Sequence, residues 1–382
     1  MNIVIAMDSF KGSLSSLCAG EAVAEGIKKA IPHSVPVVLP VADGGEGTVD
    51  ALVNGLGGML YETDATDPLG RKIKCTYGVL SDNTAVIEMC SAAGLTLLKD
   101  NERNPLNTTT YGVGQIILSA IKKGCRKFII GIGGSATNDG GAGMLEALGF
   151  QFLDENNNPV SRGGDGIKDI KHIKTEGALP ELRECSFRIA CDVTNPLCGE
   201  NGCSTVYGPQ KGASADAVEF MDKSLREYAR IVKSVFPCSD ADFPGAGAAG
   251  GMGFAFMSFL GGELVRGIDL IVSLTNMDEK IKNSHFVITG EGRIDRQTAM
   301  GKAPVGVASV AKKYGKPVVA FCGCLGEGFQ ECNNHGIDAV FSITKEPCDI
   351  KKAMESSYAS KNLTDTAEQV FRAIKTGKIY ES

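Results

Sequence analysis

The chain has 382 residues, and its 39 Lys and Arg against 45 Asp and Glu give a formal net charge of −6. With 43% hydrophobic and 22% charged residues, it is not an intrinsically disordered chain, and its length predicts about two domains. Charges of both signs are scattered along it without a basic run. The positive field that nucleic-acid binding requires is therefore missing.

The first residues, MNIVIAMDSF, are typical of a buried strand and do not resemble a secretory leader. The 13 cysteines are an odd number and lie mostly in apolar or helical surroundings. We therefore expect reduced thiols and a cytoplasmic protein. The uncharged stretch 243–262 is rich in glycine, which predicts a buried loop and helix rather than a membrane span.

Short apolar runs alternate with polar turns and helical periodicity from the N-terminus onward, which is typical of βα units in a parallel sheet. The first such unit is a predicted strand at 3–7 and a helix that ends before Pro32. The second is a strand at 37–41 and a helix that Thr48 can cap and Gly57 ends. The sequence therefore predicts the α/β class.

The middle of the chain shows a different pattern. Residues 72–80 and 84–89 alternate in period two around Ser81-Asp82-Asn83, which predicts an antiparallel hairpin, and a long amphipathic helix is expected over 218–235. Strands at 286–289, 318–322 and 339–343 then return to the parallel style. We expect a Rossmann- or flavodoxin-like domain of residues 1–68 and 284–382, a mixed α/β domain of residues 69–283 inserted into it, and an active site in the cleft between them.

Acidic residues follow several of the predicted strands, at the sheet edge where ligands bind in open parallel sheets. These groups are Asp8 with Ser9 and Lys11, Asp43 with Glu46, and Glu291 with Arg293 and Asp295. A single such acid is more often a helix N-cap. Three groups at one edge instead indicate a polar, cation-handling cleft.

Residues 127–149 form the strongest single segment, in which an apolar strand enters a glycine-rich loop and leaves as a helix. Backbone N–H groups and hydroxyls in such a loop can donate hydrogen bonds to phosphate oxygens. The candidate phosphate-binding residues are Gly133, Gly134, Ser135, Thr137, Asn138, Gly140 and Gly141. The alternative is a flexible turn in which Asp139 is an ordinary helix cap.

Several named motifs are absent. The P-loop pattern fails because Gly301-Lys302 is followed by Ala303, and the GxGxxG at 245–250 follows no predicted strand. A GxSxG motif fails at Thr137, and the cysteines lack the spacing of a zinc site. Residues 191–197 and 207–212 are predicted cleft loops. In the first of them Asp192 can serve as a general base, although a structural turn explains Asn195-Pro196 equally well.

Seven segments in order resemble the signature segments of the class I glycerate kinases. They are DSFKGS at 8–13, DGGEGT at 43–48, GGSATNDGGAGM at 133–144, CDVTNPLCG at 191–199, GPQKGA at 208–213, GAGAAGGMGF at 245–254 and GEGRIDRQTAMGKAPVGVA at 290–308. The resemblance implies a two-domain α/β kinase, with one domain inserted in the other. It also implies ATP-dependent phosphorylation of D-glycerate, typically at the 2-hydroxyl, in glyoxylate, glycolate or aldarate breakdown.

Phosphoryl transfer needs a bound nucleotide, a divalent cation and a positioned acceptor hydroxyl. We expect the 133–143 loop to hold the phosphates of ATP, Asp43 or Glu46 to bind Mg²⁺, and Asp192 to accept the hydroxyl proton. The glycerate carboxylate or the moving phosphoryl group would then meet Ser9, Lys11, Arg293 and Lys302. The sequence leaves open a glycerate 3-kinase or another hydroxyacid kinase, an NAD-dependent hydroxyacid dehydrogenase, a non-catalytic small-acid sensor, and the oligomeric state.

Overall fold

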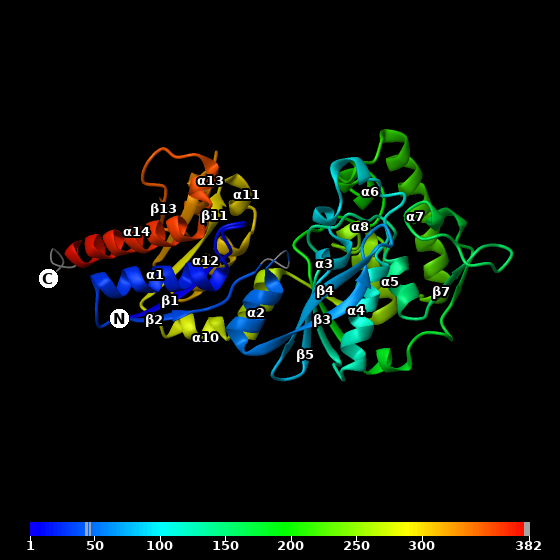
Figure 1. Ribbon diagram of the computed structural model, residues 1–382, viewed down its shortest axis with the longest axis horizontal. Coiled ribbons are helices and arrows are strands. Elements are labelled where there is room, and N and C mark those ends of the chain that lie inside the picture. Colours follow the sequence, from blue (N-terminus) through cyan, green and yellow to red (C-terminus); the bar gives the residue numbers. More distant parts are fainter. Residues whose placement is uncertain (43–44, 46, 378–382) are drawn as a thin grey trace. The chain divides into compact units, whose positions relative to one another are not determined.

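The computed structural model describes residues 1–42, 45 and 47–377. The chain folds into two compact units (Figure 1). The first comprises Met1–Asp43, Asp50–Leu56 and Gly267–Ser382, and the second comprises Gly44–Val49 and Gly57–Arg266. Within the described residues, no helix is both long and apolar enough to cross a membrane.

The limits of the two units differ from the predicted boundaries, which are 68 and 283. β3 (Gly58–Thr66) pairs along its whole length with β4 (Lys72–Leu80), so it belongs to the second unit. α9 (Gly267–Thr275) and α10 (Met277–Lys282) pack against α12 (Ala303–Lys313), so they belong to the first. Pairing partners and helix packing set these limits, and neither is visible in the local sequence pattern.

The first unit is built on a fully parallel sheet in the order β13-β12-β11-β1-β2. The strands are β1 (Asn2–Met7), β2 (Val35–Val38), β11 (Phe286–Ile294), β12 (Val318–Leu325) and β13 (Ala339–Ser342). β1 and β11 are central and almost fully buried. They are continuous apolar runs because both faces of a parallel sheet are covered.

The strand order reverses between β1 and β11. From β1 the chain passes through α1 (Ser16–Ala30) to β2 on one side, and from β11 it passes through α12 to β12 on the other. Such a reversal opens a crevice beyond the carboxyl ends of the two strands, where ligands bind in open α/β sheets. The topology thus points to the segments that follow Met7 and Gly290.

Helices cover both faces of this sheet. α1 lies side by side with α14 (Ser356–Gly377), and together they bury Ile3, Ile5 and Phe321 (Figure 1). The two helices approach closely because Gly26 has no Cβ, which would lie 2.2 Å from the carbonyl oxygen of Thr364. α12 packs on β1, β11 and β12 and adds nothing to that cluster, so it covers the opposite face.

Four shorter elements complete the first unit, although Thr48 and Val49 at the start of the first of them group with the second unit. They are α2 (Thr48–Leu56), α11 (Arg296–Ala299), η6 (Phe329–His335) and α13 (Ile350–Ala353). Gly57 follows α2 as predicted, but Thr48 does not cap it. The Thr48 hydroxyl instead donates to the carbonyl oxygen of Gly45 at 2.7 Å, and Gly47 occupies the cap position with a φ of 92°.

The second unit is built on a mixed sheet in the order β10-β9-β6-β5-β4-β3. Its strands are β3, β4, β5 (Thr84–Glu88), β6 (Lys127–Gly131), β9 (Ser186–Ala190) and β10 (Glu263–Val265), and β7 (Gln151–Leu153) and β8 (His172–Lys174) form a separate ribbon. β10, β9, β6 and β5 run parallel, whereas β4 is antiparallel to β5 and β3. The predicted hairpin and the predicted fold class are confirmed.

The helices of the second unit pack on this sheet around one apolar core. They are α3 (Cys90–Ala93), α4 (Tyr111–Lys122), α5 (Ala142–Ala147), α6 (Cys203–Tyr207), α7 (Ala215–Val235) and α8 (Ala248–Leu260), with short η1 (Leu95–Leu97), η2 (Asp100–Glu102), η3 (Gly166–Asp169), η4 (Pro180–Glu184) and η5 (Pro209–Lys211). α7 buries Met221, Leu225, Tyr228 and Val232, the spacing of one helix face.

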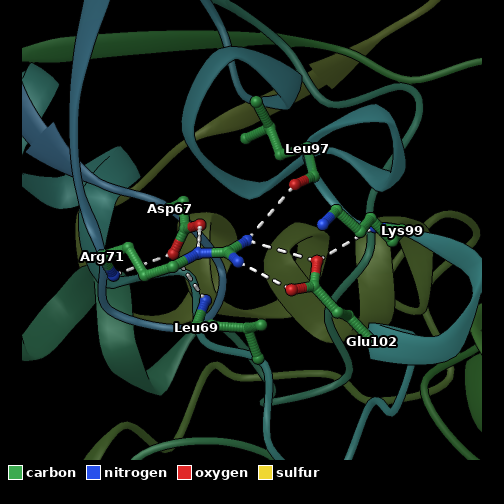
Figure 2. Close-up of polar contacts among 6 residues, drawn as sticks. All are labelled: Asp67, Leu69, Arg71, Leu97, Lys99 and Glu102. Carbon is green, nitrogen blue, oxygen red and sulfur yellow. Dashed lines mark hydrogen bonds and ion pairs between the residues drawn. The ribbon is translucent and has the colours of Figure 1, made fainter.

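An ion-pair network fastens the β3–β4 turn to η2 in the second unit (Figure 2). Arg71 lies 2.5 Å from Asp67 and 2.8 Å from Glu102, whose other oxygen accepts the backbone N–H of Lys99. Asp67 also accepts the N–H groups of Leu69 and Arg71, each at 2.9 Å. The turn, the ion pairs and η2 therefore form one connected structure.

Candidate functional site

A cavity of about 870 Å³ lies within the first unit, beyond the carboxyl ends of β1, β11 and β12. Its volume falls in the usual range for small-molecule sites. It forms at the strand-order reversal between β1 and β11, so the topological expectation and the cavity coincide. Ser9, Lys11, Arg293 and Lys302, which are four of the predicted site residues, line this one cavity.

Two buried carboxylates line the cavity. Met7 and Gly290 are paired in the sheet, and the N–H of Asp8 donates to the carbonyl oxygen of Gly290 at 2.8 Å, so Asp8, the first residue beyond β1, and Glu291, on β11, directly follow a paired position. Asp8 is 7% exposed and Glu291 is 8% exposed. Asp8 accepts the N–H of Ser9 at 2.7 Å, which fixes the orientation of its carboxylate.

The hydroxyl of Thr298 holds the other carboxylate, donating to Glu291 Oε1 at 2.6 Å. Thr298 belongs to α11, which begins where Asp295 accepts the N–H of Gln297 at 2.9 Å. The local structure therefore explains why the charged side chains of the 290–302 stretch lie at the cavity. β11 runs straight into a capped turn of helix, and this turn presents polar groups to the cavity.

The basic residues of the cavity are more accessible than its acids. Lys11, Arg293 and Lys302 are all exposed, and Arg293 Nε lies 3.1 Å from Asp295 Oδ2. An ion pair this exposed contributes little stability, so its guanidinium is available to an anionic ligand at small cost. Buried carboxylates with accessible cations beside them suit a ligand that brings both an anion and a metal cation.

Asp8 and Glu291 are also the acids of this cavity that fit a divalent cation. Mg²⁺ in kinase sites usually takes one or two carboxylates and completes its shell with water and phosphate oxygens. Among the residues that the structure describes, no group of three or more His, Cys, Asp or Glu is placed to hold a metal. The two predicted metal ligands, Asp43 and Glu46, lie outside the described residues.

The glycine-rich loop lies in the second unit and divides into two halves. Gly133 and Gly134 are exposed and Ser135 is half-buried, so these three residues are accessible to a ligand. Thr137, Asn138, Gly140 and Gly141 are buried. A Cβ on Gly140 would lie 2.8 Å from the Tyr228 ring, and one on Gly141 would lie 2.4 Å from Ala255. These two glycines therefore allow close packing beneath the loop.

Asp139 is fully buried at the centre of the loop. It accepts the N–H of Thr110 at 2.8 Å, its hydroxyl at 2.9 Å and the N–H of Gly141 at 3.1 Å. Burial raises the pKa of Asp139, and the hydrogen bonds from Thr110 and Gly141 oppose that rise. Asp139 thus joins α4 to the loop, a larger role than that of a helix cap.

The two predicted cleft loops of the second unit differ in accessibility. Asp192 is exposed just beyond β9. In the 207–212 loop, by contrast, Lys211 is only 2% exposed, so its side chain does not face a cleft. Its ammonium group donates to the carbonyl oxygen of Thr137 at 2.7 Å. Sequence reasoning missed this contact and the Thr110 contacts, since neither residue belongs to a motif that predicts burial.

Comparisons with known proteins agree on one family. A family model described as the glycerate kinase family matches residues 3–375. The glycerate 2-kinase of Escherichia coli (strain K12) is 46% identical over 372 residues, covering 96% of this chain and 98% of that protein. The glycerate kinase of Bacillus subtilis (strain 168) is 43% identical over 379 residues, covering 99% of each. A crystal structure from Salmonella typhimurium LT2, provisionally named glycerate kinase 2, matches with a TM-score of 0.90 at 42% identity and covers 99% of both chains.

Proposed function

Because this chain belongs to the glycerate kinase family, we propose that it transfers the γ-phosphoryl group of ATP to the 2-hydroxyl group of D-glycerate, giving 2-phosphoglycerate and ADP. The enzyme is thus a phosphotransferase with an alcohol group as acceptor. We assign the substrate site to the cavity of the first unit because of one observation. The buried acids Asp8 and Glu291 line this cavity together with the accessible basic residues Lys11, Arg293 and Lys302.

The acid substrate fits the basic side of this cavity. Arg293 can bind a carboxylate with two parallel N–H groups, and Lys11 and Lys302 add positive charge without a fixed geometry. Ser9 supplies a hydroxyl for hydrogen bonding to the glycerate hydroxyls. Holding the acceptor in one orientation lowers the barrier to transfer, because the entropy of orientation is lost on binding rather than in the transition state.

Mg²⁺ would supply charge neutralisation for the phosphates, and Asp8 and Glu291 would hold it. Both carboxylates are buried in the cavity, and each is oriented by a hydrogen bond, from the Ser9 N–H or the Thr298 hydroxyl. Lys11 and Arg293 would offset the remaining negative charge on the transferring group. Asp43 and Glu46 remain proposed further ligands, outside the described residues.

We assign two roles to residues of the second unit: binding the phosphates of ATP and accepting the proton of the glycerate hydroxyl. The backbone of Gly133 and Gly134 and the hydroxyl of Ser135 are accessible and can donate to phosphate oxygens. Buried Thr137, Asn138, Gly140 and Gly141 would act by shaping that segment. Asp192 is the proposed acceptor of the hydroxyl proton, because an exposed carboxylate can act as a general base.

All 13 cysteines are free, which supports a cytoplasmic location.

The direct test is ADP release from ATP and Mg²⁺ with and without D-glycerate, followed by phosphorus NMR of the product. We expect release that depends on D-glycerate and a 2-phosphoglycerate signal. A 3-phosphoglycerate signal would make the protein a glycerate 3-kinase. Glycerate-dependent reduction of NAD without ATP would make it a dehydrogenase, and thermal stabilisation by glycerate without ADP release would make it a sensor.

A further inference from the structure

Lys211 is a buried charged residue that the proposed reaction does not use. It is 2% exposed, and no other lysine of the described residues is buried to this extent. It ends η5, and Gly212 turns the chain away immediately after it with a φ of 94°. A side chain on Gly212 would collide with the backbone of Arg103, so the turn that directs Lys211 inward is closely fitted.

The ammonium group of Lys211 bonds to the backbone of the glycine-rich loop. Nζ donates to the carbonyl oxygen of Thr137 at 2.7 Å, across 74 positions of sequence. Burial lowers the pKa of Lys211 to about 8, while Cys203 and Asp139 oppose that change through space. A methionine of similar length would fill the space without this desolvation cost. What only the lysine supplies is a directional, charged hydrogen bond to the loop.

Lys211 is one of four side chains that hold consecutive residues of the loop. The Thr108 hydroxyl donates to the carbonyl oxygen of Ala136 at 2.8 Å, and Asn138 Nδ2 donates to the Ser204 hydroxyl at 2.8 Å. Thr110 donates to Asp139 through both its N–H and its hydroxyl. Residues 136–139 are therefore held from two segments of the second unit, 108–110 and 204–211, and of these four partners only Lys211 contributes a positive charge.

The accessible half of the loop continues directly from this fixed segment. Gly134 accepts the N–H of Leu95 at 2.9 Å, and the N–H of Ala136 donates to the carbonyl oxygen of Ala93 at 2.8 Å. Gly133–Ser135 thus connects the end of β6 to the fixed residues over a very short length of chain. A displacement of Thr137 would shift the N–H groups of Gly134 and Ser135, and such groups must be placed closely to bind phosphate.

We propose that Lys211 is a positioning residue for the nucleotide: by holding the Thr137 carbonyl, it fixes the Gly133–Ser135 backbone in the orientation that receives the phosphates of ATP. This inference rests on the proposed function, which assigns phosphate binding to that segment. Lys211 touches neither nucleotide nor acid, and its effect is confined to the nucleotide side of the reaction.

The test compares Lys211→Met with Lys211→Gln, which keeps an N–H donor, and with Lys223→Met, which removes an exposed lysine of α7. We expect Lys211→Met to raise the KM for ATP about tenfold or more while the KM for D-glycerate changes less than about twofold, since a hydrogen bond to a charged group is lost. Lys211→Gln should recover part of the loss, and Lys223→Met should match the wild type. Thr108→Val removes a second hydrogen bond to the same segment and should also raise the KM for ATP, so the test does not depend on one variant folding.

Calorimetric titration with ADP and Mg²⁺ separates this inference from the proposed function. If the wild type turns over D-glycerate and Lys211→Met, folded by its melting curve, keeps the wild-type KM for ATP and affinity for ADP, the positioning role is wrong and the kinase assignment stands. Equal losses for ATP and D-glycerate would also contradict it, because they indicate general disruption. If the wild type binds ADP but releases none from ATP with D-glycerate, the function fails and ADP affinity alone decides the role of Lys211.

Discussion

At the scale of single residues, Asp8 and Glu291 are the acids on which the proposed chemistry depends. Asp8 directly follows β1 and Glu291 lies on the adjacent strand β11; they are 7% and 8% exposed and line the same cavity as Lys11 and Arg293. Burying two carboxylates near each other is unfavourable without nearby positive charge. In the proposed reaction, a divalent cation bound with the substrate would supply that charge, and the accessible basic side chains would supply part of it in the absence of the cation.

Asp8→Asn and Glu291→Gln should each raise the Mg²⁺ concentration that gives half-maximal rate by at least about tenfold, because each removes an anionic ligand from the metal. Glu21→Gln, which changes an exposed acid of α1, is the matched control. The measurement is ADP release at saturating ATP and D-glycerate over a range of Mg²⁺. An unchanged Mg²⁺ dependence in both variants would exclude the two carboxylates as ligands.

Lys211 also makes folding stability depend on pH. Burial holds its pKa at about 8, below the ordinary value of 10.5. Between these values the unfolded chain carries the proton and the folded chain does not, so the free energy of unfolding rises with pH. Relative to Lys211→Met, the wild type should gain about 3 kcal/mol from pH 8 to 10.5 and lose it again as the pH falls. Urea unfolding of both proteins at several pH values measures this, and a difference that does not vary with pH would show that Lys211 titrates normally.

At the scale of elements, the sequence predicts well those strands that are buried on both faces. β1, β6, β11 and β12 begin as buried apolar runs, and each begins where the sequence places it, although β11 continues to Ile294 beyond the predicted end at residue 289 and β12 continues to Leu325 beyond residue 322. β3 is not predicted, because most of its side chains are exposed or half-buried and its Glu62 and Asp64 resemble a loop. Its stability as a strand comes from nine paired positions on β4, a property of the partner rather than of its own sequence.

The Arg71 network leads to a prediction for one element, the β3–β4 turn (Figure 2). The Asp67 side chain is 4% exposed, so Arg71→Met leaves a buried carboxylate without its charged partner and should clearly lower the urea concentration at the midpoint of unfolding. Lys74→Met removes an ion pair with Asp64, which is 87% exposed, and should leave that midpoint almost unchanged. Urea unfolding compares the two variants, and equal effects would show that burial of Asp67 does not matter.

At the scale of the whole molecule, the residues that line the cavity of the first unit could be predicted from the sequence, whereas the contacts that hold the glycine-rich loop of the second unit could not. Ser9, Lys11, Arg293 and Lys302 could be predicted because they follow predicted strands of one parallel sheet, and a sheet edge brings such segments together. The burial of Lys211 could not be predicted, because its partner Thr137 lies 74 positions away and a lysine among Gly, Pro and Gln is normally solvated. Long-range contacts of this kind need the fold before they can be seen.

The central claim is that the cavity of the first unit binds D-glycerate. The measurement that tests it most directly is kcat/KM for D-glycerate in Lys11→Ala and Arg293→Ala, with Arg372→Ala, an exposed arginine of α14, as the control. We predict that Lys11→Ala and Arg293→Ala each lower kcat/KM by about a hundredfold, equivalent to about 2.7 kcal/mol of transition-state stabilisation, and that Arg372→Ala leaves it unchanged. Values within about twofold of the wild type for both cavity variants would contradict the claim and place the acid elsewhere.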